Sequence, residues 1–102
     1  MNWINVSYNS NQNYIVQESA ILDVVNIALS SYKNIKASNS IRLSFDDKHS
    51  NVEIYVDIKI KNQKNKEPYS TIKELITQIE NGVKSLIDKK PKNVQVVLLD
   101  FY

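Results

Sequence analysis

Cysteine is absent from this chain of 102 residues, which excludes disulfide bonds and thiolate metal sites. The lack of cysteine also fits a reducing compartment. Only one glycine is present, Gly82, so glycine-rich phosphate-binding loops are excluded too. Turns that need positive φ must then use asparagine or aspartate. The clusters that could serve are Asn9, Asn11 and Asn13; Asp46 and Asp47; and Asn62 and Asn65.

Histidine and arginine each occur once, at His49 and Arg42. A Cys–His pair is therefore impossible, and a Ser–His–Asp triad would have to use His49. His49 follows Asp46 and Asp47, a group that could in principle hold a metal. A solvated hairpin turn has the same composition, and we favour it because no second histidine completes a common first shell. We expect no enzyme activity, no metal and no cofactor.

The sequence has no run of about 18 apolar residues, so it predicts no membrane span. The first six residues lack the basic and apolar regions of a signal peptide. Lysine and arginine number 13 against 11 acidic residues, a balance that does not by itself indicate nucleic acid. The richness in lysine, asparagine and isoleucine fits the codon bias of an AT-rich bacterial genome. We expect one domain over residues 1–102, located in the cytoplasm.

The clearest secondary-structure signal is the alternation of apolar and polar residues from Val52 to Ile60. A period of two over this length predicts a strand with one buried and one solvated face. Similar alternation predicts strands at residues 4–8 and 41–45, and Tyr14 to Val16 is expected to return from the first one as a hairpin. Residues 94–99 are apolar on both sides, which indicates a central or doubly covered strand. Residues 33–40 are expected to be a loop.

Two segments carry the spacing of an amphipathic helix, at residues 18–32 and from Thr71 to about Lys90. Thr71 and Glu74 have the spacing of a capping box at the start of the second helix, and Pro91 ends it. The predicted order is β-β-α-β-β-α-β. We expect an α+β two-layer sandwich with both helices packed on one face of a mostly antiparallel sheet.

Gly82 lies inside the second predicted helix, where glycine costs roughly 1 kcal/mol relative to alanine. It could allow a ligand to approach the backbone closely. Tight helix–sheet packing, or simple tolerance of the glycine, also explains it, and we favour that interpretation.

Two sets of surface residues are candidates for binding. A lysine-rich stretch, Lys59, Lys61, Lys64 and Lys66, follows the solvated side of the long strand and could bind RNA or an anionic lipid. Lysines on a solvated strand edge also prevent aggregation, and we favour that role, so nucleic acid is not the expected partner. The predicted solvated faces also carry aromatic residues, and Tyr55, Phe101 and Tyr102 are the expected interface. The other aromatic candidates are Trp3 or Tyr8, and Tyr69.

Three segments together resemble the bacterial alkaline-shock protein family. The first is residues 14–28, a short strand followed by a polar cap and an apolar helix; the second is the alternating strand Val52–Ile60. The third runs from Pro68 through the Val83-Lys84 step to the valine-rich residues 94–99. The family's usual Gly-Val after the first helix is replaced here by Asn34-Ile35, and its glycine after the long strand by Asn62-Gln63.

This resemblance implies a non-catalytic accessory or scaffold protein connected with the cell envelope and membrane lipids. It implies a protein partner or a homo-oligomer, with a lipid-metabolism enzyme as one candidate partner and membrane association only through a partner. No catalytic residues carry over from the family. The alternative function is a small RNA- or ribosome-binding domain that uses the lysine-rich stretch.

Overall fold

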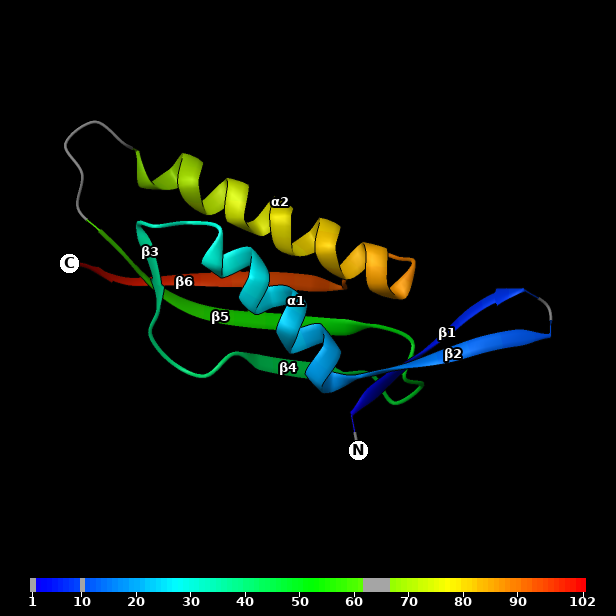
Figure 1. The fold of residues 1–102 in the computed structure, drawn as a ribbon. Coiled ribbons are helices and arrows are strands. Elements are labelled where there is room, and N and C mark those ends of the chain that lie inside the picture. Colours follow the sequence, from blue (N-terminus) through cyan, green and yellow to red (C-terminus); the bar gives the residue numbers. More distant parts are fainter. Residues whose placement is uncertain (1, 10, 62–66) are drawn as a thin grey trace.

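The computed structural model describes residues 2–9, 11–61 and 67–102, which contain two helices and six strands (Figure 1). The elements are β1 (Trp3–Asn9), β2 (Gln12–Gln17), α1 (Glu18–Ser30), β3 (Ile35–Ala37), β4 (Arg42–Phe45), β5 (Val52–Ile60), α2 (Pro68–Ile87) and β6 (Asn93–Phe101). This order confirms the predicted α+β class and adds one strand, β3.

Strand β5 is the axis of the main sheet. On one side it pairs with two short strands, β4 along its first half and β3 along its last residues, both antiparallel. On the other side it pairs with β6 along its whole length, and this pair is parallel. The sheet is therefore mostly antiparallel, as predicted, with one parallel pair that α2 connects.

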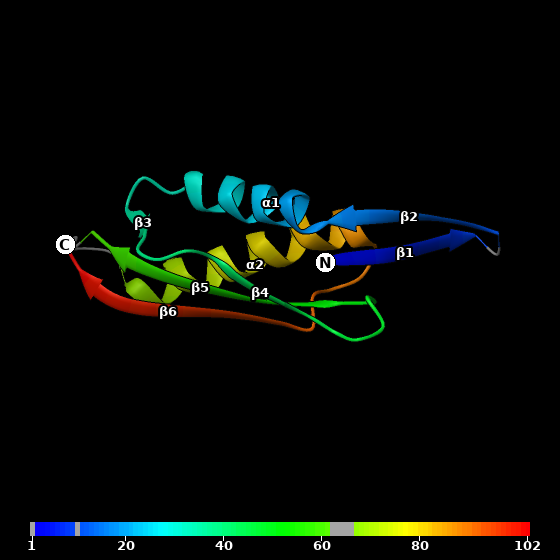
Figure 2. The same cartoon turned by 90° about the horizontal axis from the view of Figure 1, so that it is seen from below.

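Both helices lie on the same side of this sheet, which confirms the two-layer prediction (Figure 2). The predicted buried face of β5 points toward them, and all five of its apolar residues are buried. These residues are Val52, Ile54, Val56, Ile58 and Ile60. From the helices they meet Ile21 and Val25 of α1 and Leu75, Ile79 and Val83 of α2, all fully buried. The opposite face of the sheet has no helix over it.

The prediction of a loop from Lys33 to Ser40 is wrong for three residues, Ile35–Ala37, which form β3. Ile35 is buried and lies opposite Ile60 in the register with β5. A strand this short has no measurable alternation of its own, so its pairing with β5 decides its conformation.

The predicted capping box of α2 is also wrong. The helix begins earlier, at Pro68, and neither Thr71 nor its N-cap residue Glu67 makes a side-chain capping bond. Proline suits the first helical turn because its missing N–H would have no intrahelical partner there. Thr71 is instead buried on the core side. The helix ends at Ile87, and the N–H of Asp88 bonds to the carbonyl of Lys84 at 2.8 Å.

Positive φ angles fall elsewhere than predicted. Among the described residues other than glycine, positive φ angles are recorded only at His49 (54°) and Asp88 (62°). Three of the predicted substitutes, Asn13, Asp46 and Asp47, are therefore not in that region. Asn9 and Asn11 adjoin residue 10, which like Asn62 and Asn65 lies outside the described residues. His49 completes the β4–β5 turn and Asp88 ends α2, so both are single residues that reverse the chain.

Gly82 allows the two helices to pack closely. A Cβ atom built on it would lie 2.6 Å from Cγ1 of Val24 in α1. The close packing expected at this glycine is therefore present, but its partner is the other helix and not the sheet.

The β1–β2 hairpin extends from one end of the molecule (Figures 1 and 2). Residues of both of its strands pack against the rest of the protein. Ile4, Val6 and Val16 are buried against the core. The ring of Trp3 stacks on the ring of His49 with centroids 3.8 Å apart, and the N–H of Asn5 donates to the carbonyl of His49 at 2.8 Å. The hairpin thus closes onto the β4–β5 turn.

The prediction that the last strand is central or doubly covered is wrong. Strand β6 pairs only with β5, so within the described chain it forms the edge of the sheet. Its apolar residues on both sides are only partly buried, and Leu99 is 46% exposed. The sequence of β6 is that of an interior strand, although the strand lies at an edge.

Candidate interaction surface

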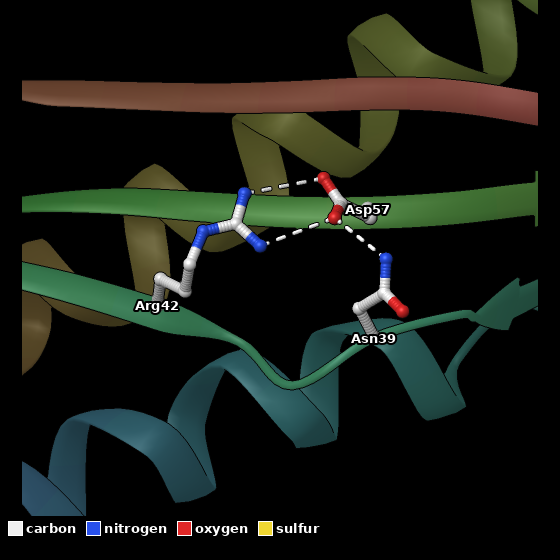
Figure 3. Close-up of polar contacts among 3 residues, drawn as sticks. All are labelled: Asn39, Arg42 and Asp57. Atoms are coloured by element: carbon white, nitrogen blue, oxygen red, sulfur yellow. Dashed lines mark hydrogen bonds and ion pairs between the residues drawn. The ribbon is translucent and has the colours of Figure 1, made fainter.

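The uncovered face of the sheet contains one buried charge, Asp57. Both of its carboxylate oxygens accept from the guanidinium of Arg42, at 3.1 and 3.3 Å, and Asn39 donates a third hydrogen bond at 2.9 Å (Figure 3). Asp57 is only 8% exposed because these two side chains cover it. The hydrogen bonds from Arg42, followed by that from Asn39, hold the pKa of Asp57 below its ordinary value.

This cluster lies where β3 and β4 leave a gap along β5. The two strands pair with residues 58–60 and 52–55, so Val56 and Asp57 face the loop that joins them. The N–H of Ser38 in that loop bonds to the carbonyl of Asp57 at 2.9 Å. The cluster therefore connects the loop between the two short strands to β5 across this gap. The bidentate arginine–carboxylate pair fixes the orientation of both side chains and balances their charges.

Tyr55, the first of the predicted interface residues, lies on the same uncovered face between Arg42 of β4 and Gln95 of β6. Its side chain is half-buried. Burial and the neighbouring charge of Glu53 raise the pKa of the Tyr55 hydroxyl. Tyr55 is thus packed among polar neighbours on its own sheet face.

The structure does not bring Tyr55 together with Phe101 and Tyr102. Phe101 lies opposite Ile60, five residues further along β5 than Tyr55, or about 17 Å at the rise of a strand. The N–H of Tyr102 bonds to the carbonyl of Ile60 at 3.0 Å, which fixes it at the same end. The predicted interface therefore divides into a central tyrosine and a terminal aromatic pair.

The lysine-rich stretch is only partly described, because Lys64 and Lys66 lie outside the described residues. Lys59 lies between Lys36 of β3 and Asp100 of β6, and Lys61 is exposed directly after β5. Lys36 was not predicted to join this group because only the strand register brings it there. With Asp100, Asp57 and Glu53 on the same sheet, the face carries both signs of charge.

An exposed apolar group gathers at the end of the sheet where β6 finishes. Phe101 is 44% exposed, Tyr102 52% and Leu99 46%; Tyr69, in the first turn of α2, is 66% exposed. The first turn of α2 and the last residues of β6 lie at the same end of the molecule (Figure 1). Four of the seven large apolar side chains that are exposed among the described residues belong to this terminal patch. The patch is defined here as Tyr69, Leu99, Phe101 and Tyr102.

The turn that contains His49 is held by Asp46. Its carboxylate accepts hydrogen bonds from the Ser50 hydroxyl and from the N–H groups of Ser50 and Asn51. These bonds, that of the Ser50 hydroxyl first, lower the pKa of Asp46 to about 2. Asp46 is thus a turn residue. In the described residues no group of three or more metal-ligating side chains comes together.

A cleft of about 310 Å³ lies where the hairpin meets the end of α2. Val6 and Ile87 are its apolar lining residues, and its polar lining includes both Lys48 and Lys89 together with Asp88. Because the lining carries both positive and negative charges, the cleft does not indicate a particular class of ligand.

In comparisons with known proteins, no family model matches the chain, and neither the curated proteins nor the solved structures give a match. No helix in the described part of the chain is long and apolar enough to cross a membrane.

Proposed function

We propose that this chain is a non-catalytic accessory or scaffold protein of the alkaline-shock type, which acts by self-association or partner binding in cell-envelope and membrane-lipid homeostasis. In this proposal it works in the cytoplasm and reaches the membrane only through a partner. A lipid-metabolism enzyme is one candidate for that partner.

The observation that carries the proposal is the terminal patch beside the free edge of β6. Monomeric proteins seldom leave exposed apolar residues gathered next to an unpaired strand, because both features promote association. Aromatic residues such as Tyr69, Phe101 and Tyr102 are also enriched at protein interfaces.

The test uses the native chain and two charged variants of similarly exposed residues. Phe101→Glu alters the terminal patch, and Ile15→Glu alters the hairpin, where Ile15 is 50% exposed. Light scattering across a concentration series measures self-association, and affinity capture from the native cytosol measures partner binding. We expect Phe101→Glu to reduce at least one of these and Ile15→Glu to reduce neither. Native protein that stays monomeric and captures no partner in stoichiometric amount would contradict the proposal.

RNA binding is a second candidate, favoured by one observation: the register places Lys36 beside Lys59 and so enlarges the lysine-rich stretch. Such binding depends on phosphate contacts and weakens steeply with salt between about 50 and 200 mM. A gel-shift titration at both salt concentrations tests it. Absence of an RNA shift at the lower concentration would eliminate this candidate.

A further inference from the structure

The free edge of β6 has few of the features that usually protect an edge strand. Such strands are kept from pairing by short length, by proline or by charged side chains, especially lysine. Strand β6 is nine residues long, and Asp100 is the only charged residue in it. A register shift beside Leu99 is its one irregularity, and it comes after six regularly paired residues.

The composition of β6 is that of a strand with neighbours on both sides. Val94, Val96 and Leu98 share the helix side of the sheet with the buried face of β5, while Val97 lies on the uncovered side opposite Asp57. All four are only half-buried. Near-continuous apolar sequence is typical of strands that are covered on both faces and paired on both edges. A further strand beside β6 would supply the missing neighbour.

Helix α2 extends over the side where this strand would lie. It packs against β6, while α1 lies over β4 and β5 (Figures 1 and 2). Gly82 marks the side of α2 that faces α1. Tyr69, Lys73 and Ile76 lie roughly 120–180° around the helix from Gly82, at 100° per residue, and so face away from α1. The ammonium group of Lys73 lies 5.8 Å from the centre of the Tyr69 ring.

This position of α2 excludes a second copy joined β6 to β6. An antiparallel pair of β6 strands about a two-fold axis would bring two copies of α2 over the same junction. Their axes would be separated by about one strand spacing, roughly 5 Å, whereas packed helices need about 8–10 Å. The occupant must be an extended segment with no helix behind it.

We propose that the free edge of β6 binds an extended, uncharged segment of a partner protein, rich in Val, Ile or Leu, which adds to the sheet as a further strand beneath α2. Backbone hydrogen bonds to β6 supply the pairing, and Tyr69 and Ile76 cover the segment on the helix side. This inference rests on the proposed function and specifies how a partner is bound.

The test uses a peptide with the uncharged sequence of residues 93–99, flanked at both ends by added lysines for solubility and carrying a fluorescent label. This probe has the required chemistry and carries no helix. Binding to the full chain is followed by fluorescence anisotropy. Two further peptides carry N-methyl groups on alternate residues, one on the odd and one on the even positions, so that each lacks the N–H donors of one strand edge.

A matched pair of protein variants locates the contact. Tyr69→Ser removes an aromatic side chain that the proposal places over the added strand, and Ile27→Ser removes a side chain of α1 that is equally exposed, 66% in both cases. We expect Tyr69→Ser to weaken peptide binding about fivefold or more, as for an aromatic anchor, and Ile27→Ser to leave it unchanged. One of the two N-methylated peptides should lose binding.

Three outcomes would overturn the inference. The parent peptide does not bind; or both N-methylated peptides bind as the parent does; or the native chain is a dimer in light scattering and the unlabelled peptide converts it to a monomer, which would make a second copy the occupant. None of these outcomes affects partner capture by the native chain, so failure of this inference and failure of the proposed function are distinguishable.

Discussion

The two edges of the main sheet differ in how well they are protected against pairing with another strand. On one edge, β3 and β4 are only three and four residues long, and each carries a basic residue, Lys36 or Arg42. On the other edge, β6 is nine residues long and carries no basic residue. The first edge is interrupted, charged and closed by the Asp57 cluster, whereas the second is continuous and apolar.

The difference shows which edge has been protected against pairing. Short strands and charges oppose the addition of another chain, and a long apolar edge favours it. Because both edges share the same central strand, packing of the core does not explain the contrast. Four predictions test this comparison, beginning with the largest expected effect.

Ile54→Ala should weaken both edges together, because Ile54 is fully buried in β5 and lies opposite both Leu43 of β4 and Val94 of β6. We expect a loss of about 2–5 kcal/mol in the free energy of unfolding, measured by urea denaturation. Val94→Ala is the control, since Val94 is only half-buried and should cost clearly less. Equal losses would show that β6 is packed as tightly as β5.

Asp57→Asn should destabilise only the protected edge, in a pH-dependent way. The pKa of Asp57 is lowered in the folded state, so its contribution is complete above the ordinary value of 3.8 and is lost as the pH falls through the lowered value. We expect the variant to melt at a lower temperature at neutral pH and to approach the native chain as the pH falls below about 4. Thermal melts between neutral pH and pH 2 measure this. Asp46, with a pKa of about 2, titrates in both proteins and cancels in the difference. A constant difference at all pH values would argue against the ion pair.

Leu99→Lys should give the unprotected edge the charge it lacks. Because Leu99 is 46% exposed, we expect a change in unfolding free energy within about 0.5 kcal/mol. Aggregation on mild heating, followed by turbidity, should nevertheless become slower. Ile27→Lys, which adds the same charge on α1, controls for a general effect of net charge. If both variants slowed aggregation equally, the effect would come from net charge and not from the edge of β6.

Lys36→Glu has the smallest expected effect. Lys36 and Lys59 lie directly opposite each other on the uncovered face, and like charges in that position are unfavourable. We expect a gain of about 0.5 kcal/mol or less in unfolding free energy, which shrinks as salt is added. Lys61→Glu, which lies beyond the paired residues of β5, should give no such gain. A loss of stability in Lys36→Glu would show that the two lysines do not interact.

Much of the fold follows from periodicity. The alternation from Val52 to Ile60 and the two helical stripes determine the layers, because each pattern is long enough to fix which residues face the core. Strand β3 is too short to carry such a pattern, and only its pairing with Ile60 reveals it. The position of β6 could not be predicted either, since its two apolar faces indicate a neighbour that the described chain does not supply.

The surface was less predictable than the core. Arg42 and Asp57 are separated by 15 residues, and nothing in their local sequence indicates a pair. Tyr69, Phe101 and Tyr102 were recognised as surface aromatics, but the strand register was needed to separate them from Tyr55. Local alternation predicts which face of the sheet a residue lies on. Its neighbours on the adjacent strands depend on the register, which is set by long-range pairing and is harder to predict.

The stacked rings at the base of the hairpin have a practical consequence. Trp3 is the only tryptophan in the chain, and it stacks on the only histidine. Its emission spectrum therefore reports on a single joint, that between the hairpin and the β4–β5 turn. If the hairpin detaches before the rest unfolds, the emission would shift at a lower urea concentration than the circular dichroism signal of the helices. One untagged sample can thus reveal whether the molecule opens in one step or in two.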